Sequence, residues 1–126
     1  MAMFPPVYDT LKANAGVKAI FGNSPRIYPH GMAPGPGETG YGVPYAVQQI
    51  ITGQPEWFLG HLPDVDSFTT QIDVYAAKVE DAANGAKAIR DALEPVAYIT
   101  WRGQFKDPDT DLFRYSMDVD WLTPRT

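Results

Sequence analysis

The sequence predicts an α+β fold, in which two helices cover one face of a mostly antiparallel sheet in the order α-β-β-β-α-β-β. Apolar and polar residues alternate from Ser67 to Ala76, which is typical of a strand with one buried face. Apolar residues three and four positions apart between 79 and 93 indicate an amphipathic helix. Because 126 residues are the length of one ordinary domain, we expect a single domain over 1–126.

The first helix is expected to begin at the proline pair 5–6, because a proline in the first turn lacks only an N–H that would be unpaired anyway. Its apolar stripe follows at four-residue spacing as Val7, Leu11 and Ala15. Gly16 is expected to end or kink this helix, and residues 17–21 to add one further short turn.

Two strands and two irregular segments are predicted next. "RIYPH" at 26–30 indicates a short strand that its proline confines to the edge or end of a sheet. "PYAVQQIIT" at 44–52 indicates a second strand, and the glycine- and proline-rich residues 31–43 indicate a flexible loop between the two. Residues 53–65 predict another irregular connection, which carries Trp57, Phe58 and Leu59.

The C-terminal half is predicted to hold a strand, the main helix and a hairpin. The helix ends before Pro95, and the segments "VAYITWRGQF" and "DLFRYSMDVDWL" flank the turn sequence "KDPDT". The last strand has one apolar and one strongly polar face. The aromatic residues of this hairpin are expected in the core: Trp101, Phe113, Tyr115 and Trp121.

Composition excludes several classes of protein. The chain is 44% apolar and 20% charged, as soluble globular proteins are, and without cysteine it has neither disulfides nor a thiolate metal site. Its net charge of −5 and its ten scattered Lys and Arg residues argue against a role in gripping DNA. The apolar runs are far too short for a membrane span, and the first residues lack the pattern of a signal peptide.

Gly35, Gly37 and Gly40 have the G-x-G-x-x-G spacing of dinucleotide-binding loops. Such a loop must open a helix, because the pyrophosphate binds the free N–H groups at the helix start. Here the glycines lead into Pro44 and a predicted strand. We therefore expect no nucleotide cofactor, and a loop that is free to make contacts.

Four aspartates around the hairpin turn match positions of a calcium-binding loop: Asp107, Asp109, Asp111 and Asp118. The position that needs glycine is Leu112, and the last aspartate lies inside a predicted strand. A hairpin turn followed by a polar sheet face is the favoured interpretation, and no metal is expected.

Few residues could support catalysis. The two histidines, His30 and His61, lie in or beside predicted loops, and no further metal ligands gather near either. None of the serines (Ser24, Ser67 and Ser116) lies in the context of an activated nucleophile. Asp64 and Asp66 could form an acid pair but belong to turn-like sequence. We predict that the chain is not an enzyme; a small hydrolase around His61 and Asp64 is a minor alternative.

The sequence resembles the tail completion, or tail terminator, proteins of long-tailed bacteriophages. The resemblance rests on "FPPVYDTLKANAGV" at 4–17, "RIYPHGMAP" at 26–34 and "PYAVQQIITGQPEWFLGHLPDVDSFTTQIDVYA" at 44–76. "AIRDALEP" at 88–95 and "DPDTDLFRYSMDVDW" at 107–121 complete it. These segments span nearly the whole chain in order.

The resemblance implies a structural protein of the virion, located in its tail or neck. During assembly such a protein is in the host cytoplasm. Proteins of this family form a ring, generally of six subunits, on the head-proximal end of the tail tube. The ring ends tube polymerisation and receives the head-tail connector or stopper protein, and DNA passes through it without specific binding. The implied partners are therefore further copies of the chain, the tail tube protein and the connector. The alternative is a small adaptor of the phage neck, or of another assembly, that never closes a ring.

A closed ring needs two different contact patches on each subunit. We expect these patches in the irregular segments 31–43 and 55–66, with Pro34, Tyr41, Trp57, Phe58, Leu59 and His61 as contact residues. A small apolar cluster beneath the loop is the other interpretation of Trp57 and Phe58. The polar face of the sheet is expected to line the channel through Gln71, Asp73, Asp118 and Asp120. A solvated outer face is the other interpretation of that polar pattern.

Overall fold

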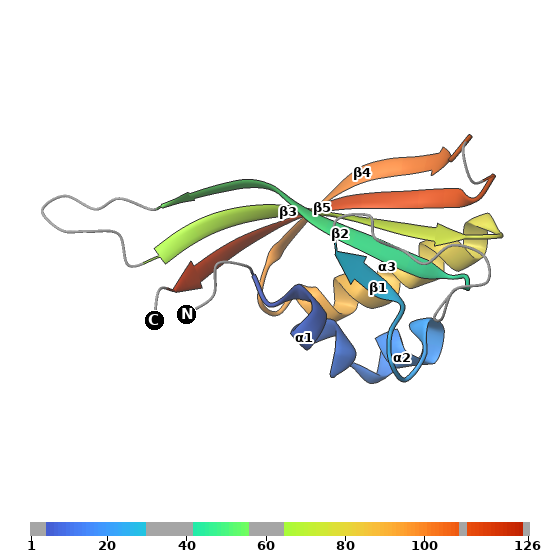
Figure 1. Cartoon of the computed structure of the whole chain (residues 1–126), viewed down its shortest axis with the longest axis horizontal. Helices are drawn as coiled ribbons and strands as arrows, with labels where there is room; N and C mark the ends of the chain where they lie inside the picture. Colours follow the sequence, from blue (N-terminus) through green and yellow to red (C-terminus); the bar gives the residue numbers. More distant parts are fainter. Residues whose placement is uncertain (1–4, 30–41, 56–64, 109–110, 125–126) are drawn as a thin grey trace, which may run out of the picture.

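The computed structural model describes residues 5–29, 42–55, 65–108 and 111–124. The elements in chain order are α1 (Val7–Lys12), α2 (Ala15–Phe21), β1 (Ile27–Pro29), β2 (Tyr45–Pro55), β3 (Val65–Ala76), α3 (Val79–Leu93), β4 (Tyr98–Lys106) and β5 (Phe113–Pro124). The strands form one sheet in the order β1-β2-β3-β5-β4, with β1 parallel to β2 and all other pairs antiparallel. All three helices lie on one face of this sheet (Figure 1). The predicted α+β fold is confirmed.

The N-terminal region corrects the predicted order, because the single expected helix is two helices. α1 ends at Lys12, and α2 begins after Asn14, whose side-chain oxygen accepts a hydrogen bond of 3.1 Å from the backbone N–H of Val17. A side chain that caps an N–H in this way starts a new helix. Gly16 therefore lies inside α2 rather than at a helix end, and the observed order is α-α-β-β-β-α-β-β.

The second strand is longer than predicted. β2 continues through Gly53 to Pro55, where an irregular connection was expected, with a bulge between Ile50 and Thr52. A Cβ atom at position 53 would lie 2.9 Å from the ring of Phe68 on β3. The glycine is thus the residue that lets an aromatic ring cross over the neighbouring strand, and its presence does not mark a loop.

The later elements form as the periodicity predicts. β3 carries the expected alternation, α3 spans the predicted apolar stripe, and β4 and β5 form the predicted hairpin. α3 lies close to the sheet at Gly85, where a Cβ atom would lie 2.9 Å from Val74 and 3.0 Å from Phe21. The core between the helices and the sheet contains Leu11, Val17, Phe21, Ile72, Val74, Ile89, Leu93, Met117, Val119 and Trp121.

Trp101 is not a core residue, contrary to the prediction. It lies on β4, the edge strand of the sheet, and 40% of its surface remains exposed. Its ring makes an edge-to-face contact with Tyr115, with 5.0 Å between the ring centroids. The alternating pattern places Trp101 on the helix side of the sheet, but no further strand flanks β4 in the described chain to cover it.

Candidate functional site

The helices leave the other face of the sheet uncovered, and we call it the open face (Figure 1). Cross-strand register places these residues on it: Tyr45, Val47, Gln49, Thr52, Ser67, Thr69, Gln71, Asp73, Tyr75, Tyr98, Thr100, Gly103, Phe105, Arg114, Ser116, Asp118, Asp120 and Leu122. All four residues predicted to line a channel lie on it. Gln71 pairs directly with Asp118, and Asp73 and Asp120 follow on β3 and β5.

Each carboxylate of the open face has a hydrogen-bonding partner. The Thr69 hydroxyl donates a bond of 2.6 Å to Asp120, and the Gln71 amide donates a bond of 3.0 Å to Asp73. The Arg102 guanidinium donates a bond of 2.8 Å from Nε to Asp118. These contacts hold the acidic groups in fixed positions on the face and reduce their availability to a ligand.

Part of the open face is more buried than a solvated sheet face would be. Asp73 is 7% exposed and its cross-strand neighbour Ser116 is 1% exposed. Among the described residues the Ser116 hydroxyl has no hydrogen-bond partner. Longer side chains adjoin the buried Asp73: the Gln71 amide donates a hydrogen bond to its carboxylate, and the charge of Arg114 interacts with it.

One end of the open face is a row of four side chains in register, Tyr45, Tyr75, Arg114 and Phe105. Tyr45 and Tyr75 stack with 5.0 Å between centroids, and the Arg114 guanidinium lies 4.9 Å from the centre of the Phe105 ring. Together they form a stacked aromatic end to the open face, whose centre is polar around Gln71, Asp73 and Asp118.

The groups in this row also alter one another's protonation. Burial raises the pKa of Tyr75, although a hydrogen bond from Arg114 acts in the opposite direction. Burial acts to lower the pKa of Arg114, but the hydrogen bond to Tyr75 and the charge of Asp73 outweigh it, so that this pKa is raised. Both groups therefore keep their protons more firmly than usual, and Arg114 is a permanent positive charge on the open face.

Sequence reasoning missed two arginines that belong to the open face. Arg102 sits at a bulge of β4 between Trp101 and Gly103, where one extra residue shifts the alternation. Arg114 lies on the polar side of the predicted alternation in β5, and its positive charge offsets the aspartates of that face. With three carboxylates and these two guanidinium groups, the face is nearly neutral rather than strongly acidic. The irregular "WRG" within a strand was the signal for the bulge.

The predicted contact residues cannot be compared with the structure, since Pro34, Tyr41, Trp57, Phe58, Leu59 and His61 lie outside the described residues. The same holds for His30, Asp64, nearly all of the loop 31–43 and most of the segment 55–66. Within the described part of the chain, no group of three or more His, Asp or Glu side chains could hold a metal ion. Asp118 of the suggested calcium loop lies on β5 and instead pairs with Arg102 of β4.

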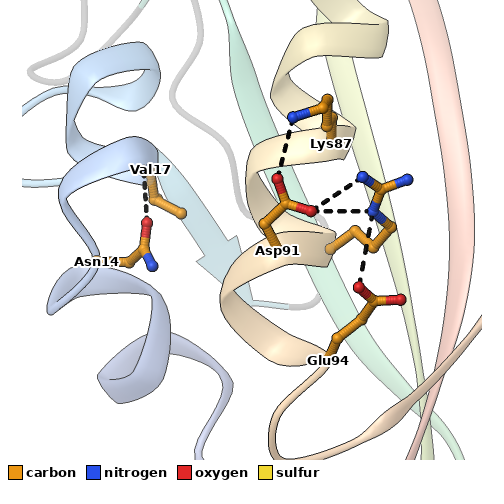
Figure 2. Close-up of polar contacts among 6 residues, drawn as sticks. Asn14, Val17, Lys87, Asp91 and Glu94 are labelled. Atoms are coloured by element: carbon orange, nitrogen blue, oxygen red, sulfur yellow. Dashed lines mark hydrogen bonds and ion pairs between the residues drawn. The ribbon is translucent and has the colours of Figure 1, made fainter.

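A hollow lies on the helix side of the sheet, between α2 and α3. It has a volume of about 610 Å³, and its lining includes Gly16, Ile20, Asn84 and Asp91. Figure 2 shows Asn14 capping α2 on one side and, on the other, Asp91 bound by Lys87 and by the neighbouring arginine of α3. Hydrogen bonds from Arg90 and then from Lys87 lower the pKa of Asp91. Asp91 and Lys87 on this surface are thus paired with each other.

The family model described as "Tail completion protein gp17" matches residues 5–124 of the chain. The chain belongs to this phage tail completion family. A comparison with curated proteins finds no match. The family match covers every described helix and strand, so the open face and both sheet edges belong to the matched region.

Membership in the tail completion family makes the chain a structural protein of a phage tail, and so a component of the virion that contacts other tail or head proteins. The family is not known for catalysis. None of the helices in the described segments has the length and apolar character needed to cross a bilayer.

Proposed function

We propose that the chain acts as a single domain that forms a ring, of six subunits as the family resemblance implies, on the head-proximal end of the tail tube. The ring stops tube polymerisation and receives the head-tail connector or stopper protein. The observation that carries this proposal is the family match over residues 5–124. A layered fold with helices on one side and a polar sheet on the other supports it, because such a subunit offers one surface to the outside and another to a channel.

The open face lines the channel in this arrangement. Duplex DNA carries about one negative charge per 1.7 Å, and a strongly basic wall would therefore retain it. The open face balances Asp73, Asp118 and Asp120 against two arginines, and so offers DNA neither strong attraction nor strong repulsion. At physiological salt, screening limits the remaining electrostatic interaction between the wall and DNA to a range of about 8 Å. DNA passes through such a wall without specific binding.

The residues at 31–43 and 55–66 are the proposed contact patches, either with neighbouring subunits of the ring or with the tail tube and the connector. Pro34, Tyr41, Trp57, Phe58, Leu59 and His61 provide apolar and aromatic groups of the kind that anchor interfaces. Assembly takes place in the host cytoplasm, and the ring remains in the neck of the virion. No cofactor or metal takes part.

Deletion of the gene tests the terminator function. Without a cap we expect tail tubes of uncontrolled length together with heads that lack tails, because nothing ends polymerisation or joins the two parts. Electron microscopy of lysates measures both, and expression of the intact chain should restore normal particles. Tails of normal length in the deletion strain would contradict the proposal and favour a neck adaptor that does not form a ring.

A further inference from the structure

The two edges of the sheet are unlike each other. At one edge β1 has three residues and ends at Pro29, which has no N–H group to offer a further strand. At the other edge β4 has nine residues and exposes three aromatic side chains: Tyr98, Trp101 and Phe105. Because β1 cannot extend a hydrogen-bonded ladder, any contact between the two edges must be made by side chains.

A hollow lies beside β1, on the side of the sheet that carries the helices. We call it the edge hollow; it has a volume of about 360 Å³, and its lining includes Pro5, Tyr8, Pro29, Gln48 and Ile50. A neighbouring hollow of about 520 Å³ shares Tyr8, Pro29 and Gln48 with it. Proline rings and aliphatic side chains make up most of the described lining, which suits an aromatic side chain better than a polar one.

The edge hollow and Trp101 lie at the same level of the sheet. Cross-strand register joins Gln48 on β2 to Ile72, then to Met117, and then to Trp101 on β4. This row crosses the sheet from the hollow at one edge to the tryptophan at the other. All of its members point to the helix side, since Ile72 and Met117 belong to the core.

We propose that Trp101 of one copy occupies the edge hollow of the next copy in the ring. The inference rests on the proposed ring and specifies one of its interfaces. In the proposed arrangement the open faces line the channel, the sheet edges meet and the strands run close to parallel to the ring axis. Rotation about that axis keeps every residue at its own height. The two groups that meet must then lie in one cross-strand row, as Trp101 and Gln48 do.

The character of the hollow supports the same pairing. Of the described residues that line the edge hollow, Asp9 alone is charged, and it already forms an ion pair of 3.2 Å with Lys12, so the hollow presents no free charge to an indole ring. Tryptophan is the residue type that most often anchors an interface, and it buries roughly 150–250 Å² when covered.

Cysteine cross-linking tests the contact, because the natural chain has no cysteine to interfere. The double variant Ile50→Cys/Ile99→Cys keeps Trp101 and places one thiol at each edge. Both thiols lie on the helix side and in one cross-strand row, which runs from Ile50 through Thr70 and Val119 to Ile99. Three strand spacings, about 14 Å, separate β2 from β4, which exceeds the reach of a disulfide within one copy. Oxidised tails are expected to give a ladder of linked copies on a denaturing gel, ending at the number of subunits in the ring.

The matched control is Gln49→Cys/Ile99→Cys, in which one thiol moves to the open face of the same strand and should form no ladder. A double variant that gives only monomers, or only dimers, would overturn the proposal. As a second measurement, Trp101→Ala should reduce ring assembly by on the order of tenfold or more, whereas Thr100→Ala should not. Normal assembly of Trp101→Ala would also overturn it.

The two proposals can fail separately. Overlong tubes after gene deletion combined with no ladder would reject the Trp101 contact and leave the terminator function in place. A ladder combined with normal tails after deletion would support the contact between copies and reject the terminator function.

Discussion

The Nε atom of Arg102 lies 2.8 Å from Oδ1 of Asp118, on the face of the sheet that the helices do not cover. The pair joins a bulge in the edge strand to the centre of β5. It places a positive charge where the pattern of residues predicted only negative ones. The electrostatic character of the open face is therefore set by pairs of side chains rather than by aspartates alone.

Replacement of Arg102 by glutamine should change the free energy of unfolding by less than about 1 kcal/mol, because both partners remain partly exposed and water screens the pair. Urea unfolding of the variant and of the natural chain measures the difference. A loss of several kcal/mol would mean that the pair contributes to the fold itself and is not mainly a surface contact.

The channel assignment predicts that Asp118→Lys combined with Asp120→Lys slows DNA ejection, because the changes turn a nearly neutral wall into a basic one. The delay should shrink as salt is raised. The matched control is Asp81→Lys/Asp91→Lys on the exposed surface of α3. If particles with the first pair eject DNA at the normal rate, the open face does not line the channel.

Gly85→Ala should destabilise the fold, although the intrinsic helix propensity of alanine is about 1 kcal/mol more favourable than that of glycine. The new methyl group would lie 2.9 Å from Val74 and 3.0 Å from Phe21, both fully buried, and overpacking of this kind costs roughly 1–3 kcal/mol. Thermal unfolding measures the net change in stability that results from the gain in helix propensity and the cost of overpacking. The neighbouring exposed change Asn84→Ala should stabilise the helix by up to about 0.7 kcal/mol.

Thr70→Val should destabilise the fold by about 1–3 kcal/mol, because it leaves the buried indole N–H of Trp121 without its acceptor. That N–H donates a bond of 3.1 Å to the Thr70 hydroxyl, and both residues are buried. Chemical unfolding measures the loss. The adjacent change Thr69→Val removes only an exposed bond to Asp120 and should cost less. Equal losses for the two variants would contradict this ranking.

The raised pKa of Tyr75 predicts that the fold loses stability in alkaline solution. Its pKa is raised above the ordinary value of 10.0, chiefly by burial, so the folded state keeps the phenol proton after the unfolded state has begun to lose it. The stabilisation from this group is complete below pH 10 and declines as pH rises above that value. Tyr75→Phe should lack this part of the decline when unfolding is followed across a pH series. Identical profiles for the two proteins would contradict the assignment.

Periodicity predicted most of the sheet and the main helix because burial of one face dominates their residue pattern. Ile72, Val74, Met117 and Val119 are all buried, as the alternation requires. The break at Asn14 was missed because a capping side chain leaves the apolar spacing of the flanking segments nearly unchanged. The extension of β2 through Gly53 was missed because only the ring of Phe68, fifteen residues later in the chain, explains that glycine.

The residues of the open face could be predicted in part, because burial of the opposite face also determines which residues of a strand lie on it. Period-two alternation is enough to place Gln71, Asp73, Asp118 and Asp120 on one face. It cannot reveal which groups they contact, because cross-strand pairing joins residues far apart in the sequence, such as Thr69 and Asp120. Exposure of Trp101 could not be predicted either, since it depends on which strand lies at the edge of the sheet.

The proline at the end of β1 has a consequence for free subunits that wait to assemble. Growth of a cross-β aggregate requires two edges that can each accept another strand. Pro29 and the short length of β1 weaken one of these edges, so pairing through β4 alone would stop at two molecules. A high concentration of unassembled subunits can therefore accumulate with little risk of fibre formation through the sheet.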